Sequence, residues 1–287
     1  MEIKVRKKRT AFGETWHQFK KNRFAVAGLI VVGLVILVAI FAPFIAPYPY
    51  DKQDLLNSYA GPSAEHLLGT DKFGRDTFSR LIWGSRNSLI MGLGCVALGS
   101  IAGITIGSIA GYFGGKTDNI IMRIMDVFSC VPMLLMCVVI AAILGPSVRN
   151  AIIAIAISTT PSAARLIRAN ILTVREKEFV EAAKAIDAGS AHIILKHIIP
   201  NAIAPTIVST TMNIGNSILS GATLSFIGLG AQPPLAEWGC MLSEGRNFMR
   251  EHMELVLFPG ICIMITVLAF NLFGDGLRDA LDPRLKN

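Results

Sequence analysis

The sequence predicts an all-α integral membrane protein with about six transmembrane helices. Hydrophobic residues make up 52% of the 287 residues and charged residues 16%, and the mean hydropathy is +0.54. A typical soluble domain carries about 25% charged residues. Six segments contain no Asp, Glu, Lys, Arg or His: 24–46, 88–111, 127–144, 151–161, 202–230 and 255–273.

Five of these segments are close to the length of a membrane span, since about 20 residues cross the hydrocarbon core. The fourth, 151–161, is short, so a span there must extend to Leu166 or tilt. The first segment has 23 residues, more than the apolar region of a secretory signal, and is therefore predicted to be a retained helix.

The basic residues predict the orientation. With residues 1–23 as a basic cytoplasmic N-terminus, 19 of the 27 Lys and Arg residues fall on the cytoplasmic side, as the positive-inside rule requires. Both termini are then cytoplasmic, and residues 24–287 form one transmembrane domain with outer loops at 47–87 and 231–254. The net charge of +7 reflects this bias and calls for no nucleic-acid partner.

The first outer loop predicts a short amphipathic helix at the membrane surface. Asp76 before Thr77 offers a helix cap, and Phe78, Leu81 and Ile82 supply an apolar face. An anion site is one reading of the nearby arginines, but a solvated, headgroup-facing position is the stronger prediction. These arginines are Arg75, Arg80 and Arg86.

The second apolar segment carries a stripe of glycines, Gly99, Gly103, Gly107 and Gly111. Glycine at every fourth position lets another helix approach closely. This pattern predicts tight packing against a neighbour in this chain or in a partner chain.

Residues 110–117 match a relaxed phosphate-binding pattern that ends in Lys116 and Thr117. Such a loop needs a preceding strand and a soluble α/β domain. Because an apolar helix precedes this loop, a glycine-rich turn between two membrane helices is predicted, and no nucleotide site.

The fifth apolar segment carries a polar stripe, Ser209, Asn213, Asn216, Ser220 and Thr223, on one helical face. Polar groups within a bilayer must face protein or water. The stripe either forms hydrogen bonds between helices or lines an aqueous path, and its two asparagines favour the path.

The cysteines and histidines predict no metal site and no catalytic cluster. The five cysteines, Cys95, Cys130, Cys137, Cys240 and Cys262, form no CxxC pair and are expected to behave as small hydrophobic residues. The nearest approach to a soft-metal cluster is Cys240, Met241, Met249, His252 and Met253. No cofactor is predicted for this chain.

Residues 176–201 form a polar segment between two apolar ones. Glu178, Glu181 and Lys184 lie on one side of a predicted helix, Gly189 breaks it, and Pro200 resets the backbone before the membrane. Its small apolar face comprises Phe179, Val180, Ala183, Ile186 and Ala188. These residues predict a compact helix that docks into a groove of another protein. The alternative is an interfacial helix that lies on lipid headgroups.

Here the sequence resembles a known family. Glu181, Ala182 and Ala183, followed by IIPN at 198–201, resemble the EAA loop of the membrane subunits of binding-protein-dependent ABC importers. Three stretches are similar to the C-type subunit of the dipeptide, oligopeptide and nickel branch: LGTDKFGRDTFSRL at 68–81, GAQPPLAEWGCML at 230–242 and FNLFGDGLRDALDPRL at 270–285. One departure is Asp187, where the family usually has glycine; Gly189 follows two positions later.

The resemblance implies a type I ABC importer-like transmembrane domain in a bacterial inner membrane, forming half of a pathway for di- or oligopeptides. It implies a homologous B-type permease, two cytoplasmic subunits that bind and hydrolyse ATP, and an extracytoplasmic binding protein as partners. ATPase coupling would involve Glu181, Ala182, Ala183, Asp187 and Gly189.

Other functions stay open at this stage. A nickel or other small-solute importer is the alternative within the branch. A six-span secondary carrier or channel would normally need ionisable residues near mid-membrane, and a membrane enzyme would need a cluster of acid, base, nucleophile or metal ligands.

Overall fold

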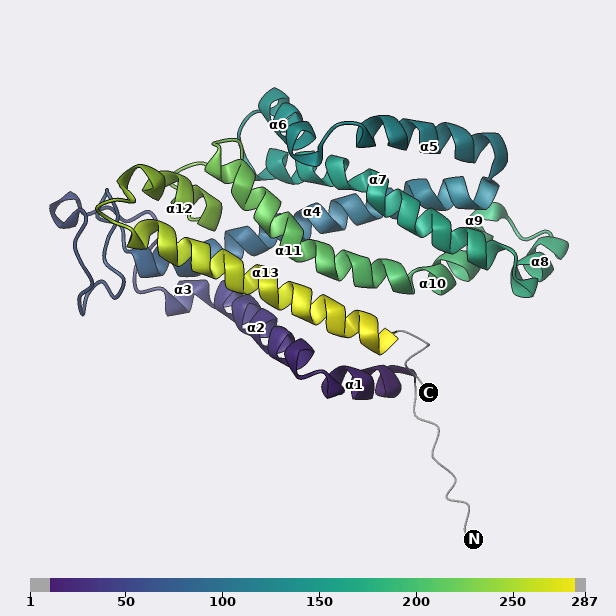
Figure 1. Ribbon diagram of the computed structural model, residues 1–287, viewed down its shortest axis with the longest axis horizontal. Helices are drawn as coiled ribbons and strands as arrows, with labels where there is room; N and C mark the ends of the chain where they lie inside the picture. Colours follow the sequence, from purple (N-terminus) through teal and green to yellow (C-terminus); the bar gives the residue numbers. More distant parts are fainter. Residues whose placement is uncertain (1–10, 282–287) are drawn as a thin grey trace, which may run out of the picture.

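The computed structural model describes residues 11–281, and every regular element in that range is a helix (Figure 1). The basic residues at 4–9 and the last part of the C-terminal motif, 282–285, lie outside the described residues. The longer helices are α1 Ala11–Lys21, α2 Arg23–Ile40, α4 Thr77–Phe113, α5 Gly115–Ser129, α6 Met133–Leu144, α7 Val148–Arg175, α11 Ala204–Phe226 and α13 Glu254–Leu281. The shorter ones are α3 Ala42–Ile45, η1 Leu55–Asn57, α8 Glu178–Ala185, α9 Ser190–His192, η2 Ile193–Ile198, α10 Ile199–Ala202, α12 Trp238–Gly245 and η3 Arg246–Phe248.

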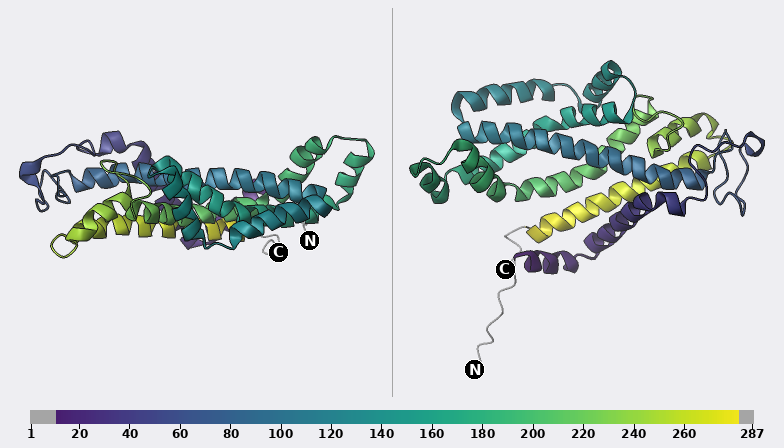
Figure 2. Two further views of the ribbon diagram at one scale, coloured as in Figure 1. Left: turned by 90° about the horizontal axis from the view of Figure 1, so that it is seen from above. Right: turned by 180° about the vertical axis from the view of Figure 1, so that it is seen from behind.

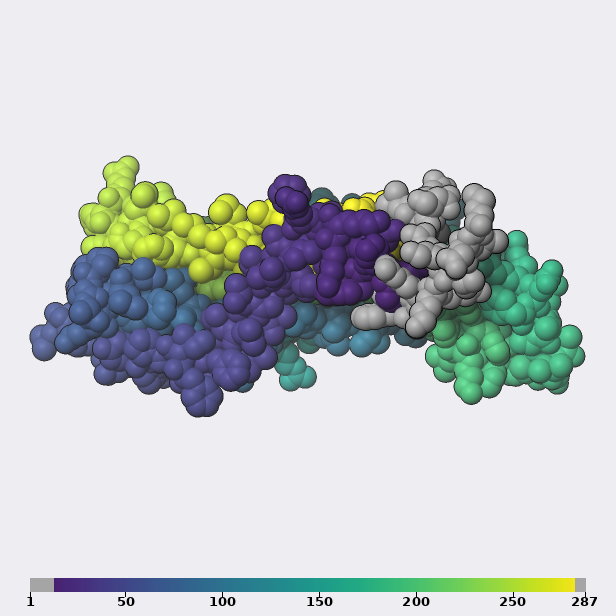
Figure 3. All heavy atoms as spheres, turned by 90° about the horizontal axis from the view of Figure 1, so that it is seen from below, coloured from purple at the N-terminus to yellow at the C-terminus, as the bar shows by residue number. Residues whose placement is uncertain are grey.

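The long helices run along the long axis of an elongated molecule (Figures 1 and 2). The first loop and the region around α12 gather at one end, and residues 176–201 project from the other (Figure 3). Following the predicted orientation, these are called the outer end and the inner end.

Within residues 11–281, between four and six helical spans are available. Four helices, α2, α4, α7 and α13, are long and apolar enough to cross a membrane, and two bent pairs bring the number to six. The pairs are α5 with α6, bent by 87°, and 190–202 with α11, bent by 65°. The predicted number is therefore reached when each bent pair counts as one span.

The short fourth apolar segment lies inside α7, an unbroken 28-residue helix that contains Pro161. The broken span is the third one, since α5 ends at Ser129 and Pro132 caps α6. Proline lacks an amide proton and disfavours helical backbone at the residue before it. The fourth segment therefore does extend past Leu166, as predicted, and the break falls in the third span, where none was predicted.

The predicted surface helix in the first outer loop is not a separate element. Asp76 does cap a helix, with Oδ2 accepting from the Ser79 amide at 2.7 Å, but that helix is α4, which continues for 37 residues to Phe113. Leu81, on the predicted apolar face, is buried beside Trp238. No helix breaker stops α4 before the apolar segment, so the two predicted elements are one.

The glycine stripe lies against α7. The nearest atoms to Gly99, Gly103, Gly107 and Gly111 all belong to α7, and a Cβ on Gly107 would overlap the Ala164 carbonyl. Close approach of two backbones allows extensive van der Waals contact. This seam joins α4 to α7, while α13 packs between α2 and α11 on the other side.

Candidate functional site

The inner segment 176–201 is anchored by its own small core. Val180 and Ala183 of α8 pack with Ile193 and Ile198 of η2. Ile167, Ile171 and Val174 near the end of α7 complete this cluster. The segment is thus a folded extension of α7, and not a loop lying free on the surface.

The apolar face predicted for α8 divides into an inward part and an outward part. Ala183 is 6% exposed, whereas Phe179 is 40% and Ile186 is 80% exposed. Leu195 of η2 is also 65% exposed. The expectation that Ala183 faces a partner's groove is therefore wrong, because the α7 and η2 side chains already cover it. Glu181 and Ala182 are exposed and do face outward.

Asp187 ends α8 in the left-handed backbone region, with φ of +54°. The Ala188 amide donates to the Ala183 carbonyl and the Asp187 amide to the Lys184 carbonyl, which is the Schellman arrangement. Glycine is the usual residue at this position because it has no Cβ, but Asp tolerates the conformation. Gly189 has φ of −58° and needs no glycine-specific conformation.

A π-helical turn, η2, lies in the second half of the inner segment and leads through α10 to α11. Such turns are rare and often lie at functional sites. The chain bends by 65° between 190–202 and α11. A movement of the inner segment would therefore reach α11 directly through the backbone.

The polar stripe on α11 faces outward from the chain. Asn213 and Asn216 are exposed, and Ser209, Ser220 and Thr223 are half-buried. The Ser220 hydroxyl donates to the Asn216 carbonyl at 2.9 Å and the Thr223 hydroxyl to the Leu219 carbonyl at 2.8 Å. The hydroxyl groups of Ser220 and Thr223 are thus satisfied within the helix, and the two amide side chains present free polar edges.

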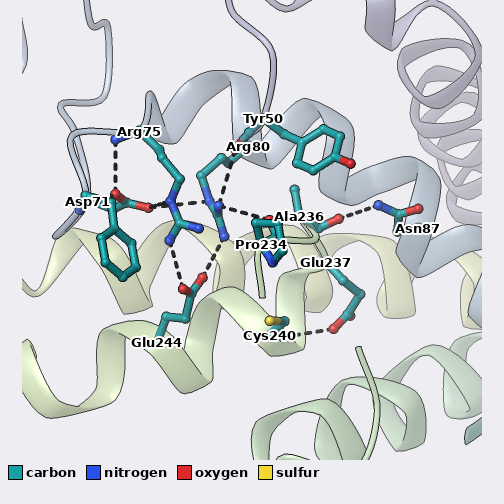
Figure 4. Close-up of polar contacts among 11 residues, drawn as sticks. Tyr50, Asp71, Arg75, Arg80, Asn87, Pro234, Ala236, Glu237, Cys240 and Glu244 are labelled. Carbon is teal, nitrogen blue, oxygen red and sulfur yellow. Dashed lines mark hydrogen bonds and ion pairs between the residues drawn. The ribbon is translucent and has the colours of Figure 1, made fainter. Parts of the chain in front are cut away.

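At the outer end, a buried charge network links three parts of the chain (Figure 4). Arg75 and Arg80 are each 1% exposed. Arg75 donates to Asp71 at 2.6 Å and to Glu244 at 2.8 Å, and Arg80 donates to the second Glu244 oxygen at 2.6 Å. The expectation of a solvated surface is wrong for these two arginines, because Asp71 and, far away in sequence, Glu244 of α12 together neutralise them. Arg86 is exposed.

The same end is tied together by further contacts. The Glu237 carboxylate caps α12, accepting from the Gly239 and Cys240 amides at 2.9 Å each. Tyr59 stacks on His252 with 4.3 Å between ring centroids. Burial, and then the charges of Asp71 and Glu251, raise the pKa of Tyr59. The outer loops therefore form a fixed cap across the ends of α4 and α13.

The residues of the suggested soft-metal cluster are dispersed. Cys240 and Met241 are buried in two different cores, while Met249 and Met253 are exposed. Burial, and then Glu244 and Glu237, raise the pKa of Cys240 to about 12, so its thiol stays protonated.

Lys116 lies in the first turn of α5, after a turn at Gly114 that has φ of +65°. The Arg175 guanidinium donates to the Gly111 carbonyl at 3.0 Å, and Arg168 pairs with Asp118. The loop is thus held against α7, in a wholly helical setting.

Comparison with known proteins defines the class. Residues 103–287 match the model of the binding-protein-dependent transport system inner membrane component, and residues 10–62 match the N-terminal transmembrane domain of oligopeptide transport permease C. The chain belongs to this family of inner-membrane transport components, as its EAA-like residues indicate. The N-terminal match places it in the C-type branch, which confirms the resemblance found in the sequence.

Several relatives resemble the chain over nearly its full length. It is 49% identical over 274 residues to the dipeptide transport system permease protein DppC of Alkalihalophilus pseudofirmus, covering 96% of this chain and 90% of that protein. It is 46% identical over 284 residues to DppC of Haemophilus influenzae, covering 97% and 96%. It is 45% identical over 287 residues to the glutathione transport system permease protein GsiD of Escherichia coli, covering 99% and 94%.

Solved structures share the fold. The chain matches the inward-facing MetNI methionine ABC transporter with a TM-score of 0.58 at 17% identity, covering 71% of this chain and 97% of that one. An amino acid ABC transporter gives a TM-score of 0.54 at 19% identity, covering 69% and 92%. The fold is therefore that of an ABC importer transmembrane subunit.

Proposed function

We propose that this chain is a C-type permease subunit of an ABC importer for di- or oligopeptides. The observation that carries the proposal is its 46–49% identity to dipeptide permeases over at least 96% of its length. The GsiD relative transports glutathione by name, which is also a peptide.

The exposed polar groups of α11 suit this substrate. Amide and hydroxyl side chains exchange hydrogen bonds with a peptide backbone, whereas nickel would call for His, Cys or carboxylate ligands. Asn213 and Asn216 offer such replaceable partners. A homologous permease subunit would supply the other half of the pathway.

The exposed apolar side chains of the inner segment suit docking of a cytoplasmic ATPase. Phe179, Ile186 and Leu195 are exposed on the inner segment, whose helix α8 projects from the helical bundle (Figure 1). ATP hydrolysis in two such partners would move this segment between two arrangements, and η2 would pass the movement to α11. The binding protein would deliver peptide at the outer end.

Reconstitution of the complete complex tests this function. The chain, its homologous permease, two ATPases and a peptide-loaded binding protein are placed in proteoliposomes. ATP-dependent uptake of a labelled dipeptide is expected, with no uptake when this chain is omitted. Nickel uptake without peptide uptake would assign the other substrate, and uptake by this chain alone would make it a secondary carrier.

A further inference from the structure

Helix α13 carries a second polar row beside the stripe on α11. Asn271, Asp275 and Arg278 are spaced by four and three residues, so they share one helical face. Asn271 is half-buried, and Asp275 and Arg278 are exposed. The two helices lie side by side in both views of the bundle (Figures 1 and 2).

Two grooves between α11 and α13 are lined mostly by apolar side chains, and each also contacts both polar rows. The groove toward the outer end, of about 540 Å³, is lined by Thr223 of α11 and Asn271 of α13. The groove at the inner end, of about 610 Å³, is lined by Ser209 of α11 and Arg278 of α13. Each groove thus pairs one residue of the α11 stripe with one polar residue of α13. The α11 stripe and the α13 row, Asn271, Asp275 and Arg278, are together called the polar wall.

Arg278 differs from the three arginines in the inner half of α7. Arg165, Arg168 and Arg175 each donate to a carboxylate or carbonyl of this chain. Among residues 11–281, neither Arg278 nor Asp275 has an ion-pair partner within 4.0 Å. The Arg278 side chain instead borders a groove whose remaining lining is mostly apolar. An exposed cation and an exposed anion thus lie one helical turn apart at the inner end of the wall.

We propose that Arg278 and Asp275 bind the charged ends of the peptide as it leaves the pathway, Arg278 the carboxylate and Asp275 the ammonium group. This inference rests on the proposed peptide import. A guanidinium presents paired donors that match a carboxylate, and a carboxylate accepts from an ammonium group. Side chains at positions i and i+3 of a helix are ~5–6 Å apart. Two extended residues span at most ~7 Å, so a dipeptide reaches both.

Cysteine chemistry tests the charge at position 278. In the reconstituted complex, exposed Cys130 is first replaced by serine. Arg278→Cys is then compared with Arg23→Cys, an exposed arginine on α2 at a similar level, since Ala25 lies against Gly276. Each variant is treated with a cationic or an anionic methanethiosulfonate, and peptide uptake and ATP hydrolysis are measured. Arg278→Lys keeps the charge on a native-like side chain.

Arg278→Cys should lower peptide uptake roughly tenfold, the scale of a lost charge-assisted contact, while ATP hydrolysis stimulated by the loaded binding protein persists. The cationic reagent should restore uptake, the anionic one should not, and Arg278→Lys should retain much of it. Arg23→Cys should transport normally throughout. Normal uptake by Arg278→Cys, or equal recovery with both reagents, would mean that the residue only contacts lipid headgroups. Failure of the unsubstituted complex to import peptide would instead refute the proposed function.

Discussion

The two ends of the molecule differ in what they bury. At the outer end two arginines are buried and paired, and at the inner end large apolar side chains such as Ile186 are exposed. A buried, paired charge has its partners within this chain, whereas an exposed apolar patch indicates a surface for another molecule. The buried charges of the outer end are therefore satisfied within the single chain, whereas the exposed apolar side chains of the inner segment offer a surface that a partner would cover. Substitution of a buried charge at the outer end should change folding, and substitution of an exposed apolar residue at the inner end should change assembly.

The largest effect is expected from Glu244→Gln at the outer end. This change leaves Arg75 and Arg80 buried with too little negative charge, and removing one partner of a buried pair costs about 3–5 kcal/mol. The thermal unfolding midpoint of the purified chain in detergent should fall steeply. Glu251→Gln, at an exposed position, is the matched control and should be near neutral. Equal midpoints for both variants would mean that the charge network does not stabilise the cap.

The next effect concerns the seam that connects the two ends. Gly107→Leu places a side chain where the Ala164 carbonyl and Ile167 lie, and overpacking costs about 1–3 kcal/mol. Gly33→Leu on α2 has open space around it and serves as the control. In the same detergent assay, the thermal unfolding midpoint of Gly107→Leu should be lower than that of Gly33→Leu. Similar stability would show that α4 and α7 can move apart without cost.

At the inner end, Ile186→Asp should leave folding intact and weaken ATPase binding by about 1–2 kcal/mol, since an exposed apolar anchor is lost. Ala183→Trp should instead destabilise the fold of the inner segment, because it overfills the core formed with Ile193 and Ile198. Pull-down of the ATPases and the unfolding midpoint are measured for both. Normal ATPase recovery with Ile186→Asp would leave the segment as an interfacial helix on lipid.

No effect is expected from Lys116→Ala. Lys116 is exposed in the first turn of α5, in a helical setting that offers no phosphate cradle. ATP hydrolysis by the assembled complex and photolabelling of this chain by an ATP analogue should match the unsubstituted protein. Photolabelling that is lost in the variant would identify a nucleotide site here.

The sequence predicted the parts of the fold that depend on local pattern. Charge-free segments located the spans, and the spacing of Gly107 and its neighbours located the α7 seam. It misplaced Arg75 and Arg80 because their partner, Glu244, is more than 160 residues away along the chain. It likewise could not separate Ala183 from Ile186, since the side chains that bury Ala183 come from α7 and η2.

Part of the polar wall was overlooked although its signal was present. Asn271, Asp275 and Arg278 lie within a stretch used only for its family resemblance, and their spacing already puts them on one helical face. What the sequence lacked was the pairing of α13 with α11, which needs long-range contacts. Helix pairing is set by packing across the whole bundle, and no local pattern encodes it.

The central claim is that the exposed face of α11 lines the transport path. Asn213→Cys and Asn216→Cys are compared with Ile207→Cys, which is also exposed but lies on the opposite face of the helix. A membrane-impermeant thiol reagent is applied to the working complex, with Cys130 replaced by serine. Positions 213 and 216 should react in at least one stage of the ATP cycle and be protected by peptide, while position 207 stays unreactive in lipid. Protection of 213 and 216 at every stage would contradict the claim and make the stripe a packing surface.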